Sequence, residues 1–65
     1  MNISQIYDDL SMFEYRLARA NYEYASYCKK SGWSDEICYR VDVLQRNIAA
    51  YEQEIEAIHE VLYWL

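Results

Sequence analysis

The chain has 65 residues with one Gly, no Pro, 11 acidic against 6 basic side chains, and a formal net charge of −5. It is too short for two domains, it lacks the long crossovers of a parallel α/β fold, and its charge is opposite to that of basic nucleic-acid binders. We see neither a signal peptide nor an apolar run long enough to span a membrane. We therefore expect a cytoplasmic protein, in the host cytoplasm if the source is viral.

The first predicted element is a helix over residues 3–30. Asn2, followed three residues later by Gln5, suits its N-cap, and Lys29 and Lys30 suit its negative C-terminal end. Apolar residues recur at alternating spacings of three and four, which is the heptad pattern of a helix that packs along one stripe. These seam residues are Ile3, Ile6, Leu10, Phe13, Leu17, Ala20, Tyr24 and Tyr27.

A turn is predicted at Ser31–Ser34. Gly32 suits a left-handed conformation at the end of the first helix, and Ser34 suits the N-cap of a second helix. Asp35 and Glu36 then lie in the first turn, where the helix dipole favours negative charge. Trp33 and Cys38 are spaced to pack against each other across this cap as a hydrophobic staple.

The second predicted element is a helix over residues 35–64. Its seam residues are Ile37, Val41, Leu44, Ile48, Tyr51, Ile55, Ile58, Leu62 and Leu65. When the chain folds back at Gly32, the residue numbers of facing seam pairs add to 64 or 65 along the whole length. The sequence therefore predicts an all-α protein, with residues 1–65 forming one antiparallel αα-hairpin. In this register Glu23 faces Arg40, and we expect a salt bridge between them.

Small residues form a second column on each helix. A hairpin of this size rarely encloses a core worth more than roughly 3–5 kcal/mol, so a partner copy is expected. The columns are either ordinary helix surface or a dimer seam, and we favour the seam, which would give a dimeric four-helix bundle. That layout resembles Rop-type dimers in architecture, without matching RNA-binding residues. The proposed seam comprises Ser4, Ser11, Ala18, Ala25, Val43, Ala50 and Ala57.

Charge divides between the two ends of the predicted hairpin. The end that carries the termini (residues 1–14 and 50–65), called the acidic end below, has seven acids and no Lys or Arg. The turn end (residues 15–49) has six bases against four acids, so we predict an antiparallel homodimer, which places acid beside base. The carboxylates of the acidic end are Asp8, Asp9, Glu14, Glu52, Glu54, Glu56 and Glu60.

Some of these acids face each other across the hairpin. Glu14 faces Glu52, and Asp9 lies opposite Glu54. They are either simply solvated or kept as a surface for a basic partner, since charge complementarity raises association rate and specificity. Carboxylates on a rod also have the means to imitate nucleic-acid phosphates in the basic groove of a nucleic-acid-processing enzyme or a defence complex.

Aromatic and flexible side chains outside the seams provide further contact candidates. Residues of these types are enriched in protein interfaces, and here they fall on outward positions or at the C-terminus. The sequence leaves open whether they contact a partner protein or a second copy of the chain. They are Met12, Tyr15, Arg19, Tyr22, Tyr63 and Trp64.

Catalytic and metal-binding patterns are weak in this chain. Glu56 and His59 have the Glu-x-x-His spacing of carboxylate metal bundles, but the seams hold no further carboxylate. Cys28 and Cys38 face each other near the turn, and we expect them to be reduced, semi-buried packing residues in a cytoplasm. We therefore predict no enzyme activity, no metal, no cofactor, no membrane contact and no direct nucleic-acid contact.

Three functions follow from this reading. We favour a non-catalytic inhibitor or regulator that binds another protein, because a tiny, acidic, Tyr-rich chain resembles phage anti-defence proteins, including anti-CRISPR proteins, in style. The first alternative is a structural or adaptor module. The second arises because Gly32-Trp33-Ser34 before a helix resembles the hairpin phosphatases that act on phosphoaspartate in sporulation signalling. Their Ser-Gln-Glu-Leu-Asp signature is replaced here by Arg40-Val41-Asp42-Val43-Leu44.

Overall fold

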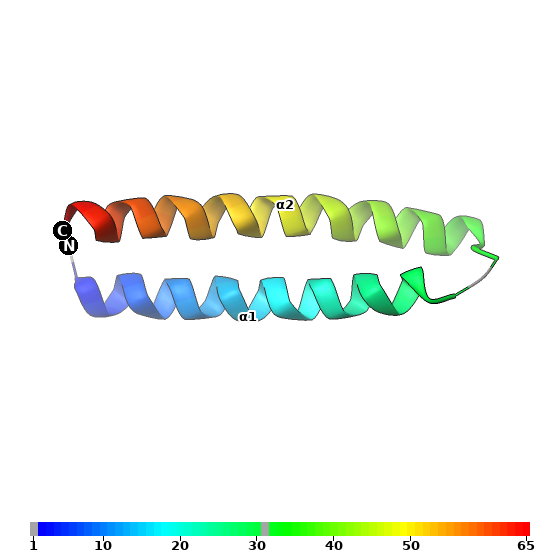
Figure 1. Cartoon of the computed structure of the whole chain (residues 1–65), viewed down its shortest axis with the longest axis horizontal. Helices are drawn as coiled ribbons and strands as arrows, with labels where there is room; N and C mark the ends of the chain where they lie inside the picture. Colours follow the sequence, from blue (N-terminus) through cyan, green and yellow to red (C-terminus); the bar gives the residue numbers. More distant parts are fainter. Residues whose placement is uncertain (1, 31) are drawn as a thin grey trace.

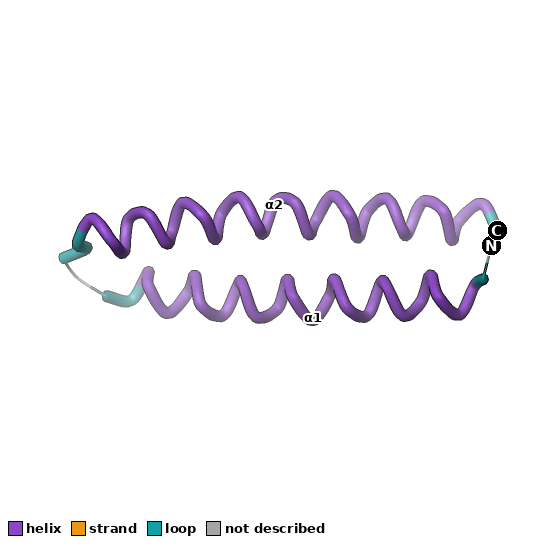
Figure 2. The backbone as a smooth tube through the Cα atoms, turned by 180° about the vertical axis from the view of Figure 1, so that it is seen from behind, coloured by secondary structure: helices purple, strands orange, loops and turns teal. Residues whose placement is uncertain are grey.

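The computed structural model describes residues 2–30 and 32–65 and consists of two long helices. Helix α1 spans Ile3–Cys28 and helix α2 spans Asp35–Trp64, packed side by side in opposite directions (Figure 1). The Cα atoms extend over 48 × 14 × 14 Å, and both termini lie at one end of this rod. The view from behind shows the same uninterrupted pair of helices (Figure 2). The predicted antiparallel αα-hairpin is confirmed.

Helix α1 begins where the sequence predicts and ends two residues early. The Asn2 side chain accepts a hydrogen bond from the Ser4 backbone N–H at 3.0 Å, which satisfies one free amide of the first turn. Gln5 does not complete a capping box, because its Nε2 donates to Asp9 Oδ1 at 2.9 Å. The C-terminal boundary at Cys28, rather than near Lys30, follows from the hydrogen bonds of the connection.

The connection is organised around the backbone carbonyl of Tyr27. Both the Lys30 N–H and the Trp33 indole N–H donate to this oxygen at 3.0 Å, so the chain leaves the helical ladder here. Gly32 has φ +73°, a left-handed conformation that Gly adopts without penalty. Ser31, the first residue of the predicted turn, lies outside the described residues. Ser34 is the predicted N-cap of α2, and its Oγ accepts from the Ile37 N–H at 3.3 Å.

The core is a thin line of side chains between the helices. Only Ala20, Val41 and Leu44 are buried among the described residues, and they lie nearer the turn than the termini. The Phe13 and Tyr51 rings face each other with centroids 6.3 Å apart, which confirms the predicted register. The remaining seam residues of both helices are half-buried, except for exposed side chains at the terminal end.

The rod leaves much of its surface open to solvent. Its accessible area is 5232 Å², whereas a compact monomer of 7.9 kDa exposes about 4,400 Å². The excess is about 800 Å², because each helix buries one stripe and exposes the rest. The rod therefore presents two long, solvent-exposed faces.

Candidate interaction surfaces

The hairpin has two long faces, one on each side of the plane that contains both helix axes. Each residue advances by about 100° around a helix, so a residue that directly precedes a seam residue lies to one side of the seam. Because the two helices are antiparallel, the residues that precede Tyr24 on α1 and Val41 on α2 lie on the same side of the hairpin. Those residues are Glu23 and Arg40, and Arg40 Nε lies 2.6 Å from Glu23 Oε2. This confirms the predicted salt bridge and identifies which positions share a face along the rest of the rod.

The face with the Glu23–Arg40 pair carries both signs of charge, and we call it the mixed-charge face. Its described cations are Arg16, Arg19, Lys30 and Arg40, and its acids are Asp9, Glu23, Glu36 and Glu54. A second hydrogen bond, from Arg40 Nη2 to Glu23 Oε1 at 3.2 Å, makes the central pair bidentate. These hydrogen bonds from Arg40 lower the pKa of the Glu23 carboxyl and raise the pKa of the guanidinium.

The opposite face has no Lys or Arg among the described residues, and we call it the cation-free face. Its acids are Glu14, Asp35, Asp42, Glu52 and Glu56. Near the turn, Asp42 is offset by Arg46 on the outer edge of α2, with Nη2 3.1 Å from Oδ2. Toward the termini, no described cation lies beside Glu14, Glu52 or Glu56, so negative charge accumulates there.

Like charges adjoin one another on this part of the molecule. Glu14 and Glu52 directly follow Phe13 and Tyr51, the aromatic pair that meets across the seam, so the two acids face each other. Glu52, Glu56 and Glu60 are spaced four residues apart on α2, where like charges destabilise a helix. The last turn of α2 has no basic residue, so nothing there complements its negative end.

The seven carboxylates of the acidic end lie on different sides of the rod. Asp9 and Glu54 lie on the mixed-charge face, Asp8 and Glu60 on the outer edges, and the remaining three acids on the cation-free face. Six of the seven are exposed, and half-buried Asp9 accepts from Gln5. In the described part of the chain both salt bridges belong to the turn end, so none involves an acid of the acidic end.

The two columns of the predicted dimer seam lie on opposite faces of the hairpin. The α1 column of Ser4, Ser11, Ala18 and Ala25 follows seam residues and therefore lies on the cation-free face. The α2 column of Val43, Ala50 and Ala57 precedes seam residues and lies on the mixed-charge face. All of these except half-buried Val43 are exposed. The dimer stays a prediction, and one two-fold interface has access to only one of the columns.

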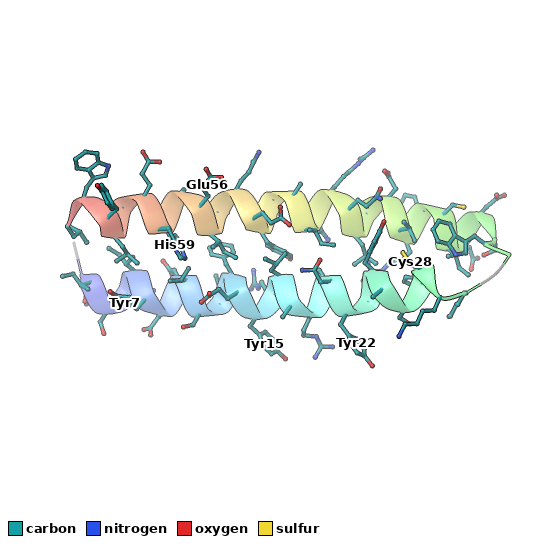
Figure 3. The ribbon with its side chains drawn as sticks, viewed as in Figure 1. Tyr7, Tyr15, Tyr22, Cys28, Glu56 and His59 are labelled. Atoms are coloured by element: carbon teal, nitrogen blue, oxygen red, sulfur yellow. The ribbon has the colours of Figure 1, made fainter. Side chains whose placement is uncertain are left out.

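The predicted aromatic contact residues are exposed. Tyr15 and Tyr22, 62% and 81% exposed, project from α1 away from α2 (Figure 3). Arg19 lies between them, and its Nη1 donates to the Tyr15 hydroxyl at 3.3 Å, which raises the pKa of the guanidinium. At the C-terminus, Tyr63 and Trp64 form an edge-to-face pair with centroids 5.4 Å apart, and both rings are exposed.

Two shallow grooves lie along the mixed-charge face. The larger, about 760 Å³, has Arg16, Arg19 and Arg40 along its walls, with Leu44 and Tyr51 from the interhelical seam. The smaller, about 500 Å³, lies near the C-terminus and is lined by Ala57, Glu60, Val61, Trp64 and Leu65. One groove is therefore cationic and near the turn end, and the other is apolar and at the acidic end.

The described residues contain no cluster of side chains suited to a metal ion. No three His, Cys, Asp or Glu side chains come close enough there to hold a metal ion, Glu56 and His59 included. Cys28 and Cys38 are free and exposed, whereas the sequence predicted semi-buried positions. They are exposed because they flank the narrow seam rather than lie in it. Neither helix, over its described residues, has an apolar stretch capable of crossing a membrane.

No protein-family model, curated protein or solved structure matches the chain. The turn that resembles those of the phosphoaspartate phosphatases is followed by residues 40–44, whose side chains stabilise the hairpin. Val41 and Leu44 are buried between the helices, and Asp42 forms a salt bridge with Arg46.

Proposed function

We propose that this chain is a non-catalytic inhibitor or regulator that binds another protein in the cytoplasm through its acidic end. Its docking surface comprises Glu14, Glu52 and Glu56 on the cation-free face, with Asp8 and Glu60 on the adjoining edges. The target presents a Lys- and Arg-lined surface, and the rod acts by occupying that surface sterically.

The observation that carries this proposal is the stacking of acids where they oppose folding. Glu52 meets like charge from Glu14 across the seam and from Glu56 one turn along α2, and Glu56 also meets Glu60. Each contact between residues four apart along α2 costs about 0.2–0.5 kcal/mol, and the pair across the seam adds to this. No described salt bridge offsets these contacts. A surface that weakens its own fold in this way is best explained by a use outside the fold, which is common at binding sites.

The shape of the rod and the line of carboxylates support a target with a cationic groove. Carboxylates on a straight, narrow rod present negative charge in a line, as nucleic-acid phosphates do, and fit a groove lined with cations. We therefore propose a nucleic-acid-processing enzyme or a defence complex as the target class, in keeping with the resemblance to anti-CRISPR proteins in style. Charge complementarity would accelerate encounter with such a groove at low salt.

The test is affinity capture with the immobilised chain, followed by binding measurements on the purified captured protein. We expect a cytoplasmic protein with a cationic groove that elutes as salt is raised. Glu52→Lys combined with Glu56→Lys should abolish its capture. As the matched control, Glu36→Lys with Asp42→Lys makes the same charge change at the turn end and should still capture it.

Other outcomes point elsewhere. Capture of only the chain itself would support the structural or adaptor module, and equal loss in both variants would show that net charge alone matters. Binding that resists high salt would move the interface to the exposed face of Tyr15 and Tyr22. Each of these results contradicts docking through the cation-free surface.

A further inference from the structure

We propose that a second copy of this chain docks antiparallel on the mixed-charge face and leaves the cation-free face outward. The inference concerns the opposite side of the rod from the docking surface and does not depend on the proposed function. It rests on the apolar groove near the C-terminus, on the distribution of charge along the mixed-charge face and on the large solvent-exposed area of the rod.

Apolar surface on the mixed-charge face is open and concave. The C-terminal groove is lined by Ala57, Val61, Trp64 and Leu65, and Trp64 and Leu65 remain 77% and 67% exposed. Met12 on α1 adds a further exposed apolar side chain on the same side. Ala50 and Ala57 keep α2 narrow here, so a second helix has room to approach closely. Burial of this apolar surface by a partner is favourable.

Charge on this face selects a second copy in antiparallel orientation. The half at the acidic end carries Asp9 and Glu54, a charge of −2. The half at the turn end has four cations and two acids, a charge of +2. An antiparallel copy sets each negative half on a positive half, whereas a parallel copy sets like on like. The negative and positive halves belong to the same face of one chain, so two copies of this face are complementary in charge when they are antiparallel.

The cation-free face is a poor alternative for self-association. A two-fold dimer through that face would bring together two copies of a surface with five acids and no described Lys or Arg. Glu14 and Glu52 lie near the middle of the rod, so they would approach their own symmetry mates. The repulsion already present in one hairpin would therefore be increased, and such a dimer is disfavoured.

The exposed area is large enough for this dimer. The rod exposes about 800 Å² more than a compact monomer of its mass, and a standard interface buries about 800 Å² per partner. In the antiparallel arrangement each helix lies on its own symmetry mate, and Ala50 lies close to the middle of α2, whose bounds are Asp35 and Trp64. Ala50 of one copy therefore lies near Ala50 of the other.

Cysteine cross-linking distinguishes the two faces and the two orientations. The background variant is Cys28→Ala with Cys38→Ala, which removes the two native, exposed thiols. Into it Ala50→Cys, Ala49→Cys or Ala57→Cys is introduced singly, and each purified protein is oxidised. Ala49 and Ala50 are sequence neighbours on opposite faces of the hairpin, so each serves as the matched control for the other.

We expect Ala50→Cys to form an intermolecular disulfide and Ala49→Cys to remain monomeric in the denatured gel. Ala57 is seven residues further from the middle, so antiparallel mates there lie about 20 Å further apart and should not cross-link. A parallel two-fold dimer sets α2 on the partner's α1, so in that case neither Ala50→Cys nor Ala57→Cys should cross-link. Loss of the Ala50→Cys cross-link, or cross-linking of Ala57→Cys as fast as Ala50→Cys, would contradict the antiparallel orientation, and cross-linking of Ala49→Cys would show the wrong face. Sedimentation equilibrium of the unmodified chain should give a dimer, and a monomer at millimolar concentration would overturn the proposal.

Discussion

Neutralising Glu52 and Glu56 together is expected to stabilise the protein. Glu52→Gln with Glu56→Gln removes three like-charge contacts, namely those of Glu52 with Glu14, of Glu52 with Glu56, and of Glu56 with Glu60. The two contacts along α2 cost about 0.2–0.5 kcal/mol each, and with the contact across the seam the gain in unfolding free energy is about 1 kcal/mol. A domain of this size gains about 4–8 °C in Tm per kcal/mol, so Tm should rise by that amount.

Thermal unfolding followed by circular dichroism at low ionic strength measures this gain. The control, Glu36→Gln with Asp42→Asn, changes the net charge equally but removes a favourable first-turn acid and the Asp42–Arg46 salt bridge. Its Tm should stay level or fall. The gain of the first variant should shrink in high salt, because screening weakens the repulsion that it relieves. A Tm that is unchanged or lower at low salt would refute the electrostatic reasoning.

Three further predictions concern the fold and its outer face. Leu44→Ala removes one of the few buried side chains and should cost about 2–5 kcal/mol in chemical denaturation, whereas Tyr39→Ala, whose ring is exposed on the outer edge of α2, should cost under about 0.5 kcal/mol. Because Arg40 lowers the pKa of Glu23, its contribution is present above the ordinary Glu value of about 4.3 and is lost as pH falls through the lower folded value. The Tm difference between wild type and Glu23→Gln should therefore vanish in acid. Tyr15→Ala with Tyr22→Ala should leave Tm within about 2 °C, because both rings are exposed.

Much of the fold could be predicted because the decisive signals are periodic. The seam spacing gives the helices, and the constant sum of facing residue numbers gives the register that Phe13 and Tyr51 confirm. Asn2, Ser34 and the Glu23–Arg40 pair were also predictable, since caps and cross-seam pairs depend on local position once the register is known.

Other features depend on which of several possible hydrogen bonds forms, and the spacing of residues does not reveal that choice. Helix α1 ends at Cys28 because the Lys30 amide and the Trp33 indole converge on the Tyr27 carbonyl, and periodicity carries no trace of that contact. Gln5 was available for the N-cap but bonds Asp9 instead.

The division of charge by face was present in the sequence but needed both helices and their register at once. Counting charge by end grouped Asp9 and Glu54 with Glu52 and Glu56. In the hairpin the first two lie on the mixed-charge face, whose cations are at the turn end, and the other two lie on the face where no described Lys or Arg is found. The two columns of small residues were likewise joined into one predicted seam from their spacing on each helix, although they lie on opposite faces of the hairpin.

The association rate constant with the captured target, measured across ionic strength, tests docking through the cation-free surface most directly. Stopped-flow or surface-based kinetics at about 20 and 300 mM salt would compare wild type with Glu52→Gln and Glu56→Gln combined. Electrostatic steering predicts a fall of at least about tenfold for wild type across this range, and a slower, flatter response for the variant. Equal rates for the two proteins, or a wild-type rate that does not change with salt, would contradict docking through these acids.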